Sequence, residues 1–425
     1  MALDPEELKR RRQQRKRQRQ EAQKKLILRL CIAGVVLILC TVLILTFAGR
    51  NQSQAEPTQP PPPVSEPEQT QPEQTQPEQT QPPQTVIHFA AAGDLNVTEQ
   101  VIASGGTNYD YTNTFLDVAY LLADADLSTV NFEGNLCGAP YGSSASAPQS
   151  LMQALRSAGV DMVQLANSYA INRGVSGLHD TIDGVRQAGM EPVGVFKDKT
   201  EFNSKKGFSM FEIQGIRIAV VSFTKGMDGT TLPPGNESCV NVLYTDYDST
   251  YQKVDKERIS DLLADVNEEN PDITIALMHW GSEFNDTISR SQKTICSLLQ
   301  ENGVDAIIGT HPHYVQKITF DPEAGQLVAY SLGDFIGDAA RSGSEYSIIL
   351  NLEITKDNTT GQTAITGYDY TPLFTAVEEG KPIRVLRIRE AIAAYEAGYM
   401  DAVSHNLYED MVYALKRAEQ RVNGE

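Results

Sequence analysis

The stretch VIHFAAAGDL, residues 86–95, is an apolar run that ends in a glycine and an aspartate. A short, β-branched and apolar run of this kind predicts a buried strand. Similar runs follow at 127–133, 162–166, 192–196, 272–279 and 306–309, and they alternate with helical patterns at 113–123, 148–158, 174–188, 251–267 and 289–302. Because strands that alternate with helices form parallel sheets, the sequence predicts an α/β domain over residues 86–425.

Two stretches interrupt this alternation. Residues 208–224 predict a hairpin that turns at Gln214-Gly215, and 315–320 with 327–335 predict another that turns within 322–325. Two further strands are expected at 347–354 and 364–372.

Polar residues follow several of the predicted strands, at the point where each strand ends. They are Asp94, then Asn131 and Glu133, then Asn167 and Tyr169, then His279 beside Trp280, and finally His311 and His313. Since open α/β sheets bind ligands at the carboxyl ends of their strands, we expect a shared cleft there. Carboxylates and imidazoles together are ligands for Zn, Mn or Fe, and such an ion can polarise a phosphoryl or acyl centre and activate water.

Each of these motifs also has a purely structural interpretation. Gly93-Asp94 is a common turn with an aspartate N-cap, and His279-Trp280 can be a core histidine beside a packed indole. His311-Pro-His313 is more specific, because the proline stiffens a loop that carries two imidazoles. The occurrence of five such strand ends in one domain favours a shared site over independent turns.

The amino-terminal part of the chain predicts a membrane anchor. Residues 30–48 are 19 uncharged, mostly apolar residues, which is long enough for a helix to cross a bilayer core. Eleven Lys or Arg precede this stretch, and after Arg50 the next basic residue is Arg156, so residues 1–29 are expected to be a cytoplasmic tail. A cleaved signal peptide is the alternative, although Gly49-Arg50-Asn51 offers a poor cleavage site.

Residues 49–85 predict a disordered stalk. They are rich in Pro, Gln, Glu and Thr and repeat with a five-residue period from Glu66 to Thr85. Such a composition forms no core and extends as a semi-rigid spacer. The expected order is therefore cytoplasmic tail, transmembrane helix at 30–48, stalk, and an extracytoplasmic domain.

The charge of the chain is unevenly distributed. The formal net charge is -19, yet residues 1–50 carry 12 basic and 4 acidic side chains, whereas residues 86–425 carry 24 basic and 46 acidic ones. An acidic domain repels phosphate backbones, which argues against nucleic acid as a partner. Five scattered cysteines do not make a disulfide scaffold, and the sequence leaves the pairing of Cys137, Cys239 and Cys296 open.

Six blocks of sequence, in order, resemble the CapA family of poly-gamma-glutamate capsule biosynthesis proteins. They are Gly93-Asp94, Asn131-Phe-Glu133, Leu165-Ala-Asn167 followed by 174–181, His279-Trp-Gly-Ser-Glu283-Phe284, 309–316 (GTHPHYVQ) and 330–336 (YSLGDFI), all within 86–340. The resemblance implies a four-layer α/β/β/α sandwich similar to calcineurin-like metallophosphatases. It also implies a metal-facing set of Asp94, Glu133, His279, His311 and His313.

The sequence departs from the family pattern at one strand end. Where the family has Ala-Asn-Asn-His, this chain has Ala166-Asn167-Ser168-Tyr169, so a bridging amide becomes a hydroxyl and the acid histidine becomes a phenol. Asp334 stands where an Asn is usual. The resemblance gives catalytic roles to Tyr169 and His313 and substrate-contacting or supporting roles to Asn131, Asn167, Trp280, Glu283 and Asp334. Since a phenol is a weak acid near neutral pH, catalysis is left open. A two-metal hydrolase is less favoured here than in a typical relative, and a single metal ion or none is the alternative.

Three functions remain open from the sequence. The first is a membrane-anchored, outward-facing protein that synthesises or exports an anionic capsule polymer such as poly-gamma-glutamate, in a bacterial envelope and beside membrane subunits of a capsule synthase. The second is a metal-dependent hydrolase of phosphoester or amide bonds. The third is a non-catalytic scaffold of a synthesis complex. The acidic surface requires a bound cation or a local basic groove if the polymer is anionic.

Overall fold

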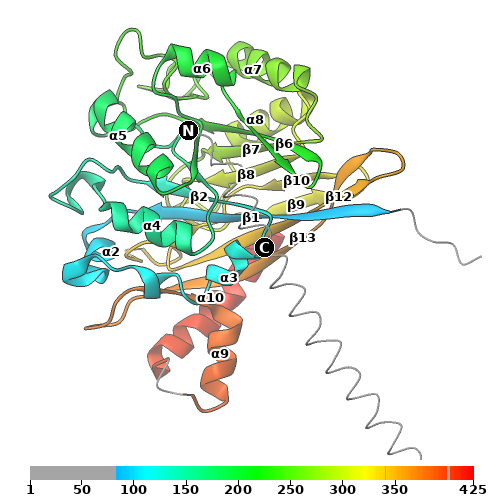
Figure 1. The fold of residues 1–425 in the computed structure, drawn as a ribbon. Helices are drawn as coiled ribbons and strands as arrows, with labels where there is room; N and C mark the ends of the chain where they lie inside the picture. The colour runs from blue at the N-terminus through cyan, green and yellow to red at the C-terminus, as the bar shows by residue number, and fades with distance from the viewer. Residues whose placement is uncertain (1–82, 340, 400–402) are drawn as a thin grey trace, which may run out of the picture. The chain divides into compact units, whose positions relative to one another are not determined.

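The computed structural model describes residues 83–339, 341–399 and 403–425. Its strands form two sheets, and the first comprises β1 Gln84–Asn96, β2 Leu127–Glu133, β3 Met162–Gln164, β4 Glu191–Val193, β11 Asp334–Ile336, β12 Tyr346–Asp357, β13 Thr363–Ala376 and β14 Arg384–Arg387. The second comprises β5 Ser209–Ile213, β6 Ile216–Thr224, β7 Ile273–His279, β8 Ala306–Thr310, β9 Ile318–Asp321 and β10 Gln326–Ala329. The spatial orders are β14-β13-β12-β1-β2-β3-β4, with β11 beside β1, and β5-β6-β7-β8-β10-β9 (Figure 1).

Helices cover the outer faces of both sheets, and the last two helices of the chain pack on the inner side of the first sheet. The helices are α2 Glu99–Ser104, α3 Ala119–Ala123, α4 Gln149–Ser157, α5 Gly174–Gln187, α6 Lys199–Lys205, α7 Lys256–Glu268, α8 Arg290–Glu301, α9 Ile388–Glu396 and α10 His405–Asn423, with short 3-10 turns η1 Gly106–Asn108, η2 Thr112–Thr114 and η3 Ser143–Ala145. One buried cluster joins α2 to α5 to the first sheet, a second lies between the sheets, and a third joins α7 and α8 to the second sheet. The arrangement is a mixed α/β fold of helix, sheet, sheet and helix layers.

The alternation of side chains along β1 explains how one strand serves two cores. Phe89 and Ala91 point to the cluster between the sheets, whereas Ala90 and Ala92 point to the helices. Both faces of this strand are therefore apolar, as is typical of a central strand in a layered α/β fold.

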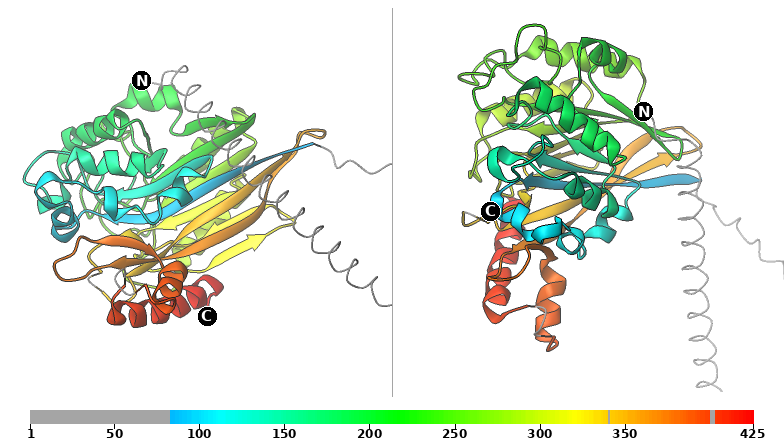
Figure 2. Two further views of the ribbon diagram at one scale, coloured as in Figure 1. Left: turned by 60° about the horizontal axis from the view of Figure 1, so that its bottom comes forward. Right: turned by 60° about the vertical axis from the view of Figure 1, so that its left-hand side comes forward.

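The last two helices pack on the inner side of the first sheet. In α10, Leu407, Met411, Ala414 and Ala418 recur at three- and four-residue spacing and belong to the cluster between the sheets. These helices contact β12 and β13, and Figure 2 shows them beside the C-terminal strands. They extend the middle core beyond the second sheet.

Most of the predicted strands are confirmed within a few residues, including the hairpin formed by β5 and β6. The second predicted hairpin differs at its end, because β10 stops at Ala329 and the chain then crosses to the first sheet, where β11 pairs with β1. The expectation of parallel strands holds for β1 to β4, whereas β12 to β14 are antiparallel.

The predicted tail, transmembrane helix and nearly all of the stalk lie outside the described residues. Within the described ranges, no helix combines the length and apolar character of a membrane span. Cys137, Cys239 and Cys296 are free thiols in the structure.

Candidate functional site

The predicted strand-end residues of the two sheets meet in one buried cluster. Asp94 and Glu133 come from β1 and β2, His279 ends β7, and His311 and His313 follow β8. Parallel pairing fixes their levels, because Asp94 is in register with Asn131, and His279 with Thr310. These side chains are buried, since His313, the most exposed of the five ligand candidates, retains only 7% of its surface.

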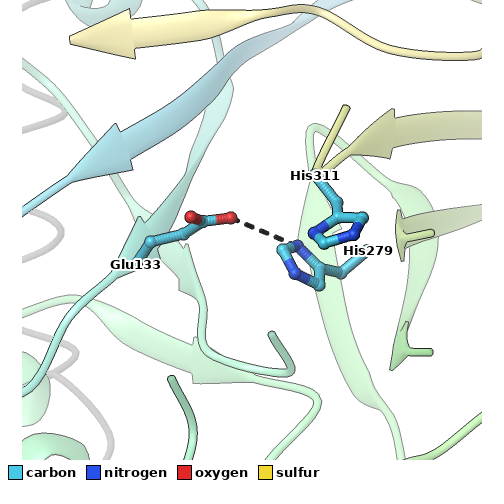
Figure 3. A group of neighbouring side chains, drawn as sticks. All are labelled: Glu133, His279 and His311. Atoms are coloured by element: carbon cyan, nitrogen blue, oxygen red, sulfur yellow. Dashed lines mark ion pairs between the residues drawn. The ribbon is translucent and has the colours of Figure 1, made fainter. Parts of the chain in front are cut away.

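The first group of candidate ligands is Glu133, His279 and His311 (Figure 3). Their ligand atoms lie within 4.8 Å of one another, and Glu133 Oε1 is 3.5 Å from His279 Nδ1. The two imidazole rings are tilted, with centroids 4.4 Å apart. Burial, followed by nearby positive charge, lowers the pKa of both His279 and His311 well below the usual value, so both rings are neutral.

The second group is Asp94, His313 and Asp334. His313 Nδ1 is 2.8 Å from Asp334 Oδ1 and 3.8 Å from Asp94 Oδ2. Burial alone would lower the pKa of His313, but the charge and hydrogen bond of Asp334, followed by Glu133 and Asp94, raise it to about 11. This imidazole is therefore a cation held between carboxylates, unlike the rings of the first group.

Close approach of two backbones creates this second group. A Cβ on Gly93 would lie 1.9 Å from the carbonyl oxygen of Gly333, so glycine is required at residue 93, where the residue before β11 approaches β1. The Asp94 N–H donates to the same carbonyl at 3.0 Å, and Asp334 comes into register with Asp94.

Amide side chains hold the two groups together. Asn131 Nδ2 lies 2.6 Å from Asp94 Oδ1 and 3.2 Å from Glu133 Oε1, and donates to both carboxylates. Asn167 Nδ2 donates in turn to Asn131 Oδ1 at 3.0 Å. Burial, followed by the charge of Asp94, raises the pKa of Glu133 well above its usual value, and burial raises the pKa of Asp94 to about 6. The amides thus orient two buried carboxylates.

The loop between the two histidines has an unusual backbone. His311 and His313 have φ values of 90° and 58°, which non-glycine residues rarely adopt. The His311 N–H donates to Asp94 Oδ2 at 3.0 Å, and the ring of Phe284 stacks on His313 at a centroid distance of 4.9 Å. Strain held by such contacts is typical of functional sites.

Of the two departures at Ser168 and Tyr169, Ser168 contacts the first group directly. The Ser168 N–H donates to His279 Nε2 at 3.2 Å, and the Ser168 hydroxyl is 3.1 Å from the same nitrogen. The side chain of Tyr169 packs partly against the helix-covered core, and burial raises its pKa above the usual phenol value. A phenol with a raised pKa is a poor proton donor near neutral pH.

Two other predicted residues lie outside the cluster. Trp280 is fully buried in the third core, where its Nε1 donates to the Tyr330 carbonyl at 2.9 Å, so it does not contact a ligand at the cluster. Its neighbour His279 faces the other side of the strand, as alternation requires. Glu283 is exposed and acts on the cluster through its charge. A surface cavity lined by residues of α6 and α7 contains none of the predicted residues.

One contacting residue was missed by the sequence analysis. Lys225 follows β6, and its Nζ lies 3.3 Å from His311 Nε2 and 3.0 Å from the Gly281 carbonyl oxygen. Burial lowers its pKa, against the charges of Glu283 and Asp228. The rule that polar residues gather at the carboxyl ends of strands applies to β6 as well, and could have indicated Lys225.

The donor atoms fit a divalent transition metal. Each group combines imidazole nitrogen with carboxylate oxygen, the ligand types that Zn, Mn and Fe accept. The first group offers neutral imidazoles, whereas His313 in the second group would have to lose a proton before it could bind a metal ion. In the first group, His279 Nε2 accepts the Ser168 N–H, so the neutral ring carries its proton on Nδ1, toward Glu133. A metal ion at Nδ1 would require this proton to move to Nε2, where the Ser168 hydroxyl could accept it. Such support of a ligating histidine by an outer hydrogen bond is common at metal sites. The roles of these residues as ligands or catalysts stay predictions.

Comparison with solved structures finds calcineurin-like phosphoesterases among the similar folds. The phosphoesterase YfkN from Bacillus subtilis is 16% identical, with a TM-score of 0.42 over 80% of this chain and 98% of that one. A phosphatase from Mycoplasma pneumoniae is 13% identical, with a TM-score of 0.41 over 68% of this chain and 94% of that one.

Comparison of sequences gives closer relatives. A Bacillus anthracis protein named capsule biosynthesis protein CapA is 27% identical over 67% of this chain and 65% of its own length. A Bacillus subtilis protein named PGA biosynthesis protein CapA is 25% identical over 51% of this chain and 53% of its own length. The matches thus cover less than two thirds of either relative.

The family described as bacterial capsule synthesis protein PGA_cap matches residues 88–339, a segment that contains both groups of candidate ligands. This match covers more than half of the chain, and the chain belongs to the bacterial capsule synthesis protein family.

Proposed function

We propose that this protein takes part in the synthesis or export of an anionic capsule polymer, such as poly-gamma-glutamate, with a divalent metal ion held at the strand-end cluster. The observation that carries the proposal is the pair of buried groups, Glu133–His279–His311 and Asp94–His313–Asp334. Burying several ionisable side chains costs folding free energy, so such a cluster is retained more readily where it binds a ligand. Membership of the capsule synthesis family supports the choice of a capsule polymer.

The chain's own residues define what the cluster does. A bound metal ion supplies Lewis acidity and activates water. Asn131 orients Asp94 and Glu133, so their oxygens face one position. His313 holds a proton on Nδ1 toward Asp334 and is the cationic acid of the second group. Tyr169 is a weaker proton donor than this imidazole. The groups accordingly support binding and polarisation of an anionic centre better than rapid acid catalysis.

The localisation belongs to the proposal. The apolar stretch 30–48 and the basic residues before it favour a single-pass anchor with the folded domain outside the cell. Membrane subunits of a capsule synthase are then the proposed partners, and the excess of acidic residues makes nucleic acid an unsuitable one.

Metal analysis tests the central point. The full chain, purified in detergent, is stripped with a chelator, equilibrated with Mn²⁺, Zn²⁺ or Fe²⁺, and analysed for bound metal by mass spectrometry. Stoichiometric metal is expected in the wild type and in His88→Ala, because His88 lies exposed on β1, away from the cluster. His279→Ala and Asp94→Ala should lose it. Metal-free wild type that folds normally would instead favour the scaffold.

The polymer is tested separately. The full chain, loaded with the metal ion, is incubated with γ-linked polyglutamate. New amino termini and the length of the polymer are then measured. Shortening or transfer that requires His279 supports action on the polymer, whereas cleavage of phosphoesters alone favours the hydrolase. Binding without any change supports a role in export.

A further inference from the structure

Lys225 is the cation that contacts the first group of candidate ligands. It leaves the end of β6, its backbone N–H donates to the His279 carbonyl at 2.8 Å, and its side chain turns toward His311. The ammonium donates to the Gly281 carbonyl at 3.0 Å and lies 3.3 Å from His311 Nε2. The Tyr251 ring, 4.8 Å away, supports the charge from another side.

The contact with Lys225 determines which nitrogen of the neutral His311 ring carries the proton. An ammonium group has only donors, so the neutral ring must offer the Nε2 lone pair to Lys225 and carry its proton on Nδ1. A metal ion needs a lone pair from the same ring. If it takes Nε2, Lys225 must leave, and if it takes Nδ1, the proton moves to Nε2 and the bond to Lys225 is broken.

We propose that Lys225 competes with a divalent metal ion for His311, and so limits metal occupancy of the Glu133–His279–His311 group. The inference rests on the metal site of the proposed function and adds the residue that sets its affinity. Charge repulsion acts in the same direction, because the Lys225 ammonium beside His311 repels a metal ion bound to that ring.

Two carboxylates could pair with the Lys225 ammonium group if a metal ion displaced it from His311. Asp228 and Glu283 are the carboxylates whose charges act most strongly on Lys225, and they belong to loops after β6 and β7. Movement of the side chain toward them would keep the charge paired while it frees His311.

A double-mutant cycle tests the proposal. Mn²⁺ and Zn²⁺ affinities of the chelator-stripped full chain are measured by calorimetry for the wild type, Lys225→Met, His311→Ala and the double variant. Lys225→Met should bind about 10-fold more tightly, equal to about 1.4 kcal/mol. The gain should vanish in the His311→Ala background, because the lysine acts through that ring. Lys253→Met, an exposed lysine in the loop that carries Tyr251, should match the wild type.

The other results decide against the proposal. Unchanged metal binding by Lys225→Met would mean that the lysine does not affect the metal site, and weaker binding would mean that it helps to hold the metal ion. An equal gain in affinity with and without His311 would mean that the lysine acts only through long-range charge repulsion. Lys225→Gln, which removes the charge but keeps a polar side chain, gives the same reading if the Met variant folds poorly. Loss of metal in His279→Ala with no change in Lys225→Met overturns this inference alone, whereas no metal binding by any variant overturns the proposed function as well.

Discussion

The two groups of candidate ligands share a strand edge and similar residue types, yet they differ in charge. In Glu133–His279–His311 the imidazoles are neutral and the cation is Lys225, from outside the group. In Asp94–His313–Asp334 the imidazole itself is the cation. The difference teaches that the state of a histidine depends on how many carboxylates surround it, since burial alone acts in the same direction on all three rings.

Removal of one imidazole from each group is expected to give the largest effect. His313→Ala should destabilise the metal-free protein by about 3 kcal/mol, because it leaves buried Asp94 and Asp334 without their cation. His311→Ala should cost about 1 kcal/mol, because a neutral ring is lost. Urea unfolding of both variants measures the difference. Equal losses of stability in the two variants would contradict the difference in charge between the two groups.

A partly buried carboxylate, Asp305 at the opposite end of β8, provides the next comparison. Burial raises the pKa of Asp305 to about 6, while its carboxylate accepts the Thr274 N–H at 2.8 Å. The folded state therefore binds its proton more tightly than the unfolded state does, and stability falls as the pH rises from about 4 to about 6. Asp305→Asn keeps the acceptor and should add about 2 kcal/mol at neutral pH.

The pH profile supplies the control for that variant. Below about pH 4, where the carboxyl is protonated in both states, Asp305→Asn and the wild type should unfold at the same urea concentration. A constant difference across the whole range would mean that packing, and not charge, separates the two proteins.

The hydroxyl of Ser168 sharpens the view of the first group. Ser168→Ala removes the hydroxyl that could accept a proton from His279 Nε2 once a metal ion takes Nδ1, so Mn²⁺ affinity should fall about 10-fold, as for other outer-shell contacts. Ser168→Thr keeps the hydroxyl and should retain most of the affinity. Calorimetry on the full chain compares them. If Ala and Thr bind alike, the hydroxyl has no part in the metal site.

The smallest effect is expected at Tyr169. The wild type should turn over generic phosphodiesters slowly or not at all, because its phenol has a raised pKa. Tyr169→His supplies an acid with a pKa nearer neutrality and should raise any turnover several-fold at most, since the general acid contributes about 100-fold or more only when well positioned. Release of nitrophenol measures it. Fast wild-type turnover that Tyr169→His abolishes would refute this role for the phenol.

Much of the fold was predictable because it depends on local pattern. The strand β2 matches its predicted bounds, and the hairpin of β5 and β6 turns at Gln214-Gly215 as expected. The crossing of β11 to β1 was not predicted. It depends on the contact between Gly93 and Gly333, which are far apart in sequence, and no periodicity records such a contact.

The candidate site was predictable in part. The strand-end rule brought Asp94, Glu133 and the three histidines together, but it also included Trp280, whose side chain belongs to the opposite face of its strand. Lys225 was missed because a single lysine after a strand is common on surfaces, and only its distance to His311 sets it apart.

The sequence alone determined most of the strands, where their polar ends lie and to which family the chain belongs, because these follow from residue type and spacing along the chain. The tertiary structure alone decided that His313 is charged while His279 and His311 are neutral, and that Lys225 contacts the cluster. The physical reason is that burial and Coulomb interaction depend on distances between residues from both sheets, and such distances exist only once the chain has folded.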